Sequence, residues 1–281
     1  MNNNIQINGT QLFYHDDYKN SNLNEYYEYI LLLLKDFLSK NNILYSVNFG
    51  CYGINCDINL DFQYEHTIIK HEDKLYCKIH RHEDLIKLSN VFEYCNANIH
   101  HVGQYSKYND YSNIVKYIPP ILFDISNDGI RNKDTIVVHT SSKRREEIIK
   151  EIKCDYFHNV CGSDVYDKNN IKNVLNGYKV LLNIHQVDNH LTLEELRVLP
   201  SLLTGILIIS EDVPYKESIP FSKHIIWSDR DNIKETLDKV LQNYEEYREK
   251  YLHGLNETYN LLKSITEKNI HSVFHSFLKK I

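Results

Sequence analysis

The second half of the chain alternates between short apolar segments and longer amphipathic ones. Five apolar runs rich in β-branched residues have the composition of buried strands. They cover residues 135–139, 156–160, 179–184, 206–209 and 224–227. Four segments between or after them have helical periodicity, at residues 144–153, 169–175, 193–203 and 232–243. Strands that alternate with crossover helices predict a doubly wound α/β domain with a parallel sheet covered on both faces.

Helix-end signals support this order of elements. Ser142 precedes the segment 144–153, and serine is a preferred N-cap residue. Gly205 follows the segment 193–203, where glycine commonly ends a helix with positive φ.

The first half is less regular. Residues 22–40 have helical periodicity, residues 43–49, 58–62 and 74–79 read as strands, and 83–89 as a short helix. Pro119 and Pro120, followed by the polar residues 127–133, interrupt this pattern. We therefore predict two Rossmann-like α/β domains, with the boundary between residues 118 and 133.

Composition and charge narrow the class of protein. The chain has 281 residues, 42% of them hydrophobic and 25% charged, which is a globular composition. Its net charge of −6 argues against nucleic acid as a partner, because binding to phosphate backbones needs a basic face. No run approaches the roughly 20 apolar residues of a membrane span, and the N-terminus lacks a signal-peptide pattern. We expect a cytoplasmic protein without a transmembrane segment.

The cysteines and histidines do not predict a metal centre. The six cysteines form no CxxC pair, so we interpret them as reduced and mostly packed in cores. His80, His82, His100 and His101 form the tightest histidine groups, and none has the spacing of a zinc site. The sequence also lacks GxGxxG and GxxxxGK[ST], which disfavours a dinucleotide-dependent dehydrogenase and a P-loop NTPase.

Candidate chemistry gathers after the strands of the second half, where ligands bind in open parallel sheets. Ser141, Lys143 and Arg144 follow the first strand, and such a basic helix start can bind a diphosphate or can be merely solvated. His185, Thr192 and Arg197 follow the third strand. Ser210 and Glu211 follow the fourth. Together they form the candidate donor-binding set.

A carboxylate near the start of segment 193–203 can accept hydrogen bonds from two ribose hydroxyls. Glu194 and Glu195 are the candidates, and Glu194 is our choice. The alternative is a carboxylate that only interacts with the helix dipole. Arg197 can bind the diphosphate or form a surface ion pair with Glu194 three residues earlier.

Several of these segments resemble a known family. Residues 180–185 (VLLNIH), 193–197 (LEELR), Gly205 and 208–212 (IISED) are similar to the donor domain of GT-B glycosyltransferases of the glycosyltransferase group 1 (GT4-like) superfamily. The segment 137–145 resembles their first donor-domain strand and basic turn. The segment 63–67 (QYEHT) is similar to a segment of their N-terminal domains.

The resemblance implies two Rossmann-like domains facing a cleft. Residues 1–122 would form the acceptor-side domain, 123–250 the domain that binds a nucleotide-sugar, and 251–281 a helical tail that packs back on the N-terminal domain. The implied activity is transfer of a sugar from a nucleotide-sugar to a glycan or other acceptor hydroxyl. Lys143, Arg144 and Arg197 would neutralise the leaving diphosphate, and Glu65 or His66 would be the general base. Glu65 and His66 can equally be buried polar residues whose hydrogen bonds are satisfied.

The sequence predicts no cofactor and no metal. Asp229 and Asp231 form a D-x-D segment at a helix start, away from the candidate donor edge, so we expect a metal-independent reaction. Two other classes stay open: a non-catalytic glycan- or protein-binding module of GT-B type, and a nucleotide-sugar epimerase. The nucleotide, the sugar, the acceptor, the stereochemistry and the oligomeric state do not follow from the sequence.

Overall fold

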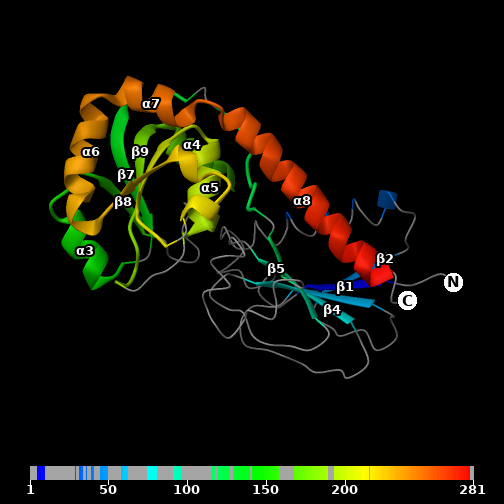
Figure 1. Ribbon diagram of the computed structural model, residues 1–281. Coiled ribbons are helices and arrows are strands. Elements are labelled where there is room, and N and C mark those ends of the chain that lie inside the picture. The colour runs from blue at the N-terminus through cyan, green and yellow to red at the C-terminus, as the bar shows by residue number, and fades with distance from the viewer. Residues whose placement is uncertain are drawn as a thin grey trace. The chain divides into compact units, whose positions relative to one another are not determined.

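The computed structural model shows a chain that divides into two compact units (Figure 1). Unit 1 comprises residues 1–19, 23–120 and 263–281, and unit 2 comprises 20–22 and 121–262. The structure describes residues 5–9, 29, 32–33, 36, 39–40, 45–49, 58–62, 75–80, 91–95, 115–117, 119–126, 129–139, 141–158, 168–188, 193–214 and 216–278.

Unit 2 contains a five-stranded sheet in which all neighbouring strands are parallel. The strands are β7 (Lys133–His139), β8 (Asp155–His158), β9 (Tyr178–Asn183), β10 (Leu207–Glu211) and β11 (Ile225–Ser228). Their order across the sheet is β11-β10-β9-β7-β8. The predicted parallel sheet is confirmed, and each predicted strand of this half lies within a few residues of its observed bounds.

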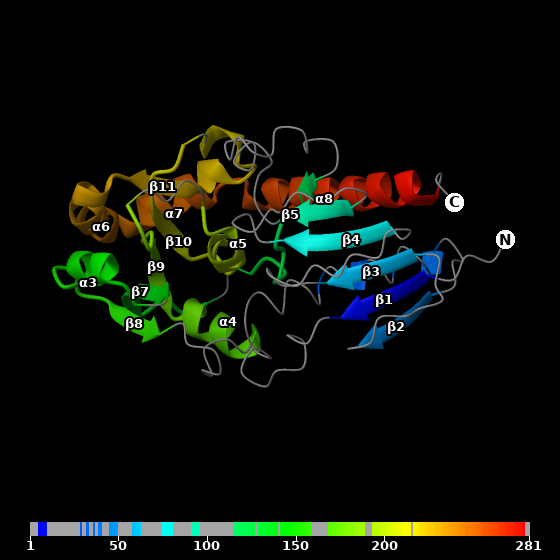
Figure 2. The same cartoon turned by 90° about the horizontal axis from the view of Figure 1, so that it is seen from below.

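Helices connect these strands as the periodicity predicted. They are α3 (Lys143–Ile149), α4 (Lys168–Asn176), α5 (Glu195–Leu203) and α6 (Ile233–Gln242), followed by α7 (Tyr244–Leu252) and α8 (Leu255–Leu278). Three 3₁₀ turns, η5 (Lys216–Ser218), η6 (Ser222–His224) and η7 (Arg230–Asn232), flank β11. In Figures 1 and 2, α3 and α6 cover one face of the sheet, and α4 and α5 cover the other.

The two predicted helix ends have the expected geometry. The Ser142 side chain accepts a hydrogen bond from the backbone N–H of Arg145, so Ser142 is the N-cap of α3. Gly205 has φ of 79° and its N–H bonds the carbonyl of Leu202, which ends α5. Ser142 fixes where the chain turns into α3 after leaving β7, and Gly205 ends α5 before the chain enters β10.

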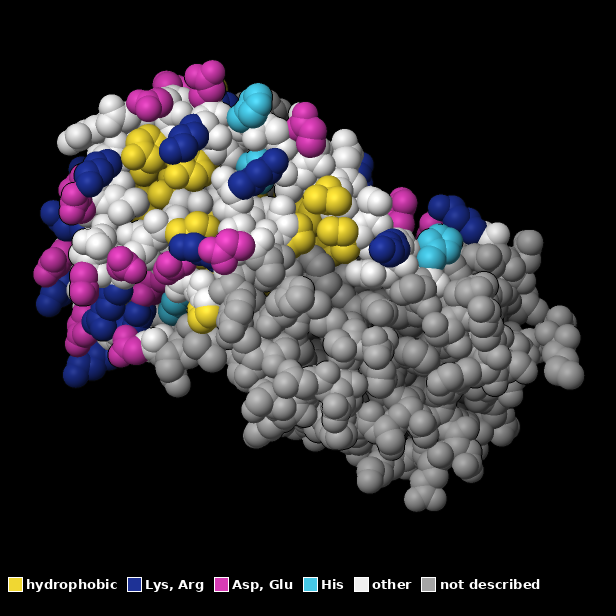
Figure 3. Space-filling view, in the orientation of Figure 1, with side chains coloured by type: hydrophobic (Ala, Val, Ile, Leu, Met, Phe, Trp, Pro, Cys, Tyr) yellow, Lys and Arg dark blue, Asp and Glu magenta, His cyan; other side chains and the backbone are white. Residues whose placement is uncertain are grey.

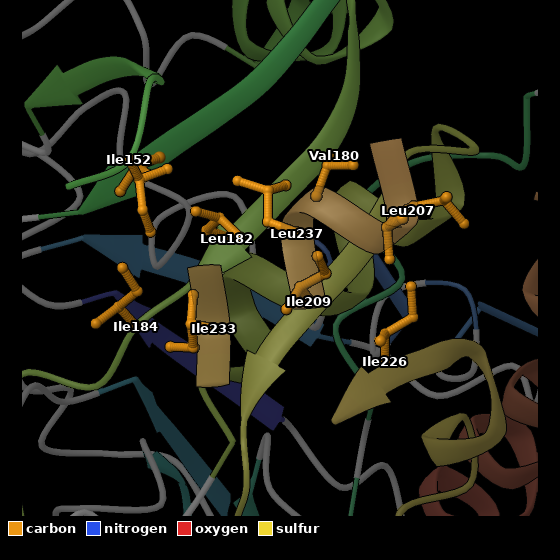
Figure 4. Packing of buried hydrophobic residues seen from close by; sticks show 11 residues of the cluster. Ile152, Val180, Leu182, Ile184, Leu207, Ile209, Ile226, Ile233 and Leu237 are labelled. Carbon is orange, nitrogen blue, oxygen red and sulfur yellow. The ribbon is translucent and has the colours of Figure 1, made fainter. Parts of the chain in front are cut away.

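The core of unit 2 lies between the sheet and α6. Val180, Leu182 and Ile209 on the strands meet Ile233 and Leu237 of α6, as Figure 4 shows. Each of these five side chains is at most 3% exposed. Alternation along the strands sends Leu181 and Ile208, which are also fully buried, to the opposite face. A sheet apolar on both faces explains why these strands read as continuous hydrophobic runs.

Unit 1 contains a second parallel sheet, visible as adjacent arrows in Figure 2. Its strands are β1 (Ile5–Gly9), β2 (Tyr45–Phe49), β3 (Ile58–Phe62), β4 (Leu75–His80), β5 (Val91–Cys95) and β6 (Val115–Tyr117). The order is β2-β1-β3-β4-β5-β6, so both sheets place their first strand between the second and third. The sequence predicted β2, β3 and β4. It did not predict β1, β5 and β6, which are short and carry polar residues such as Gln6, Glu93 and Lys116.

Helical structure in unit 1 is described in part. Tyr29, Leu33 and Asp36 are helical, in agreement with the predicted helix at 22–40. Burial raises the pKa of Tyr29 to about 12, and its hydroxyl hydrogen-bonds Thr266 of α8. The predicted helix at 83–89 lies outside the described residues. None of the described helices combines the length and the apolar character needed to cross a membrane.

Candidate functional site

The carboxyl ends of β7 and β9 lie side by side in the middle of the unit 2 sheet. The chain runs from β7 outward to β8 and then returns to β9, so the direction of the crossovers reverses between these two strands. Such a reversal opens a crevice at the carboxyl edge of a doubly wound sheet, which is where ligands bind. The candidate site is this edge, together with the starts of α3 and α5.

Alternation along the strands divides the polar residues of this edge between two faces. Asn183 and Ser210 are register partners on β9 and β10, and the Asn183 Nδ2 donates to Ser210 Oγ at 3.0 Å on the α5 face. Glu211, one residue further along β10, contacts α3 through Arg144. The sequence placed Ser210 and Glu211 at one edge. The structure separates them: Glu211 belongs to an α3 cluster with Arg144, and Ser210 belongs to an α5 cluster with Asn183.

Arg144 is the centre of the α3 cluster. Its Nη1 and Nη2 donate to the two carboxylate oxygens of Glu211 at 2.8 and 2.5 Å, and Nη1 also donates to the carbonyl of His185 at 2.9 Å. Its Nε donates to Asp188 Oδ1 at 2.5 Å. The hydrogen bond with Glu211 raises the pKa of Arg144 above its ordinary value. The Arg144 charge is therefore already compensated by two carboxylates.

Arg145 joins the two clusters from a buried position. Its side chain is 3% exposed, its Nε donates to the carbonyl of Ile184 at 2.8 Å, and its Nη2 lies 3.5 Å from Glu194 Oε1. Burial lowers the pKa of Arg145 to about 10, and the nearby charge of Arg197 acts in the same direction. The two adjacent arginines thus have opposite electrostatic surroundings.

Glu194 is the N-cap residue of α5, but its side chain does not cap the helix. It accepts a hydrogen bond from Asn183 Nδ2 at 2.8 Å and lies 3.1 Å from His185 Nδ1. With Arg145 close by, this carboxylate is held from three directions and is 12% exposed. The alternative of a simple helix-terminus carboxylate does not describe these contacts.

His185 lies between the two glutamates. Its backbone N–H donates to Glu211 Oε2 at 2.6 Å, while its ring faces Glu194. Burial opposes protonation of the ring. The hydrogen bond to Glu194 and the negative charges of Glu194 and Glu211 outweigh it, so the pKa of His185 is raised.

The remaining candidate residues have separate surroundings or lie outside the described residues. Arg197 Nη1 donates to Asn183 Oδ1 at 2.8 Å, so it belongs to the α5 cluster and not to a surface ion pair with Glu194. Ser141 hydrogen-bonds Glu146 through its side chain. Lys143 is exposed at the start of α3. Thr192, Glu65 and His66 lie outside the described residues.

Four residues of the site were not among the candidates. Arg145 and Asn183 were passed over, although both stand beside chosen residues. Arg145 and Asn183 are buried because α3 and α5 pack against β9. Asp188 and Arg230 were missed because they are 42 residues apart, and only the fold brings Arg230 Nη1 within 3.1 Å of Asp188 Oδ1.

The arrangement suits a ligand that carries both negative charge and hydroxyl groups. Arg144, Arg145 and Arg197 supply positive charge from two helices. Glu194 and Glu211 supply carboxylate acceptors at the same edge. Charged groups at a partly buried edge interact with a ligand more strongly than they would in water.

Comparisons with known proteins give a fold and no family. No model of a protein family matches the chain. The chain is 26% identical over 269 residues to the uncharacterized protein R358 of Acanthamoeba polyphaga mimivirus. This match covers 84% of this chain and 94% of the relative.

Three solved structures resemble the chain over nearly its full length. An α-glucosyltransferase in complex with UDP and a 13-mer DNA containing a HMU base matches with a TM-score of 0.54 and 8% identity, over 94% of this chain and 99% of that one. T4 phage BGT in complex with UDP and Mn²⁺ matches with 0.57 and 10%, over 98% and 99%. The DNA-modifying enzyme β-glucosyltransferase matches with 0.56 and 10%, over 98% of both chains.

At these identities the likeness shows the fold. The chain has the α/β, GT-B-like fold of glycosyltransferases that have been solved with UDP or uridine diphosphoglucose.

The comparisons correct the exclusion of nucleic acid. A protein of this fold has been solved with DNA, so the fold is compatible with a nucleic-acid partner. The net charge of −6 does not exclude such a partner, because net charge sums over the whole chain, whereas binding depends on the local field of one face. Figure 3 shows Lys and Arg side chains interspersed with Asp and Glu over α3, a distribution that the total conceals.

The expectation that no cofactor takes part is also corrected, since T4 phage BGT has been solved with Mn²⁺ as well as UDP. The absence of a D-x-D segment at the donor edge was not a sufficient reason to expect metal independence. In the part of the chain that the structure describes, no three His, Cys, Asp or Glu residues form a group that could hold a metal ion. Glu194 and Glu211 are engaged by arginines, so we assign no metal ligand and derive no step through a metal.

Proposed function

We propose that the protein transfers a sugar from a nucleotide-diphosphate sugar to an acceptor hydroxyl. The nucleotide to consider first is UDP, which two of the similar structures contain. The acceptor to consider first is a hydroxyl group on a DNA base, since one similar structure contains DNA with a HMU base. A glycan hydroxyl is the acceptor class that the sequence favoured.

One observation carries this proposal: a network of three arginines and two glutamates at the switch point of a doubly wound sheet. A structural sheet edge seldom concentrates so many partly buried charges, because burying them costs free energy unless each is paired. Charged groups with perturbed pKa values in such a position are typical of binding sites. The full-length likeness to UDP-bound transferases supports the choice of ligand.

The residues would divide the donor between them. Glu194 would accept hydrogen bonds from the ribose hydroxyls, and Lys143, Arg144 and Arg197 would stabilise the charge that develops on the leaving diphosphate. His185, Ser210 and Glu211 would belong to the same donor site, with Ser141 and Thr192 at its margin. Arg145 would hold Glu194 in place through its ion pair.

The narrower parts of the proposal concern the arrangement of the chain. The two units would form a GT-B pair about a cleft, as in the group 1 superfamily. Residues 1–122 would lie on the acceptor side and 123–250 on the donor side. The tail 251–281 would pack on the acceptor-side domain. A general base on the acceptor side, Glu65 or His66, would deprotonate the acceptor hydroxyl if the reaction inverts configuration.

The test is a transfer assay with radiolabelled UDP-glucose. Acceptors are a DNA 13-mer that contains HMU, the same oligomer with thymine, and a mixture of glycans, each with Mn²⁺ and with EDTA. We expect label on the HMU oligomer and none on the thymine oligomer. Glu194→Gln should reduce transfer by about tenfold to a hundredfold, the range for a lost hydrogen bond to a charged group. Glu235→Gln, an exposed carboxylate on α6, is the matched control and should have no effect.

Other outcomes would redirect or reject the proposal. Label on the glycans alone would keep the transferase and reject the DNA acceptor. Conversion of the sugar without any acceptor would indicate an epimerase. Failure to bind UDP, GDP, dTDP or CMP nucleotides in a thermal-shift screen, where a ligand at 100 times its Kd adds about 2.7 kcal/mol, would reject the donor site.

A further inference from the structure

A single carboxylate oxygen lies between two guanidinium groups at the margin of the α3 cluster. Asp188 Oδ1 accepts from Arg144 Nε at 2.5 Å and from Arg230 Nη1 at 3.1 Å. Arg144 belongs to α3 and Arg230 to η7, so the fold brings two cations from separate elements to one point. Arg230 also lies 3.6 Å from Glu147 on α3.

The surroundings of this oxygen are those of an anion site. Guanidinium groups bind carboxylate and phosphate oxygens with the same N–H geometry, so a position that holds a carboxylate oxygen between two arginines also fits a phosphate oxygen. Both arginines lower the pKa of Asp188. Arg144 additionally connects the point to Glu211 and His185 of the candidate donor site.

Asp188 is held much less firmly than the other partner of Arg144. Its side chain is 75% exposed, whereas that of Glu211 is 5% exposed. Exposed ion pairs are weak because water screens them, while a partly buried bidentate pair is not easily replaced. A competing anion would therefore displace Asp188 and leave Glu211 in place.

We propose that Arg144 and Arg230 form a phosphate subsite that Asp188 occupies with its own carboxylate until a ligand displaces it. The inference rests on the proposed function for the source of the phosphate and adds Arg230 and Asp188 to the site. Two sources share this chemistry, the diphosphate of the donor and a backbone phosphate of a DNA acceptor.

The two residues have opposite expected effects on anion binding. Asp188→Asn removes the competing charge and should raise the affinity for inorganic pyrophosphate about twofold to fivefold, the range for an exposed pair. Arg230→Gln removes a cation of the subsite and should lower that affinity by about fivefold, the upper end of the range for an exposed pair. Both effects should shrink at high ionic strength, since screening acts on exposed charges.

The matched controls are on α6. Asp238→Asn and Lys234→Gln make the same charge changes in an exposed ion pair, with side chains 58% and 57% exposed. Calorimetry with pyrophosphate, UDP, UMP and a DNA 13-mer on the full chain measures each affinity. A loss with Arg230→Gln for UDP and not for DNA identifies the donor diphosphate. A loss for DNA, with a shallower salt dependence, identifies the backbone phosphate.

The result that overturns the subsite is a change no larger than that of the controls, or pyrophosphate binding that neither substitution alters. This outcome is separate from the fate of the proposed function. Pyrophosphate binding with the opposite effects of the two substitutions and no sugar transfer would keep the subsite and reject the transferase. Sugar transfer without those effects would keep the transferase and reject the subsite.

Discussion

Arg144 and Arg145 are adjacent in the sequence and differ sharply in their electrostatic surroundings. Arg144 is 12% exposed and is paired with Glu211 and Asp188, and its pKa is raised. Arg145 is 3% exposed, its carboxylate neighbour Glu194 lies at 3.5 Å, and burial lowers its pKa to about 10. Consecutive residues of a helix point about 100° apart, so the Arg144 guanidinium reaches Glu211 and the Arg145 guanidinium reaches the carbonyl of Ile184.

The burial of an arginine and the free energy lost on its removal are different quantities. Burial lowers the pKa of the more buried arginine, which donates a hydrogen bond to the carbonyl of Ile184. The more exposed arginine neutralises Glu211, a carboxylate that is itself 5% exposed. What a substitution costs therefore depends on the charge that it leaves behind.

The largest expected effect follows from that difference. Arg144→Met should lower the free energy of unfolding of unit 2 by about 3–5 kcal/mol, because it leaves the buried charge of Glu211 without its partner. Arg145→Met should cost about 1–3 kcal/mol, because Glu194 keeps Asn183 and His185 while the carbonyl of Ile184 loses a donor. Denaturant unfolding followed by the fluorescence of Trp227, the single tryptophan, measures both in unit 2.

A double variant checks the stated cause. Adding Glu211→Gln to Arg144→Met removes the stranded charge and should recover part of the loss. Equal costs for the two single variants, or a larger cost for Arg145→Met, would contradict the comparison.

The next effect concerns two buried histidines whose pKa values are shifted in opposite directions. His185 faces Glu194 beside Arg145, and its pKa is raised above the ordinary 6.5. Its contribution to stability is full below that value and is lost as the pH rises through the folded pKa. Burial lowers the pKa of His224, which hydrogen-bonds the carbonyl of Tyr251 and the hydroxyl of Thr258. Its contribution is present above 6.5 and is lost as the pH falls through the folded pKa.

Unfolding at about pH 5 and about pH 8 separates these contributions. His185→Gln should reduce stability more at the lower pH, and His224→Gln should reduce it more at the higher pH. If both variants lost more stability at the same pH, Glu194 would not hold a proton on His185. Arg145→Met should raise the pKa of His185 further, since it removes a compensating cation from Glu194, and NMR titration of the ring measures this.

The smallest expected effect is that of Asp188→Asn on stability. The Asp188 side chain is 75% exposed, so its pairs with Arg144 and Arg230 are screened by water. The unfolding midpoint should not change measurably, and it should match that of the control Asp238→Asn. A shift as large as that of Arg145→Met would show that Asp188 is a structural partner of Arg144 and not a displaceable one.

The sequence determined the fold of unit 2 better than that of unit 1. Strands such as β9 and β10 are apolar on both faces because helices cover them, and this produces a signal strong enough to interpret without a structure. Strands such as β1 and β6 have five and three residues with polar positions among them, which periodicity cannot separate from loops. The likeness to solved transferases, at 8–10% identity, rests on the arrangement of the strands and not on residues.

The sequence by itself also selected the edge that carries the candidate residues, since the carboxyl ends of parallel strands meet at one edge whatever their side chains. It selected Arg144, Glu194 and Arg197 from that edge. Only the tertiary structure decided which charges meet, because the pairing of Arg144 with Glu211, 67 residues away, depends on the position of α3 against β10. Side-chain burial decided the pKa values of the two arginines. Arg144 and Arg145 are the same residue type in the sequence, but their different directions on the helix give them different neighbours, so their pKa values shift in opposite directions.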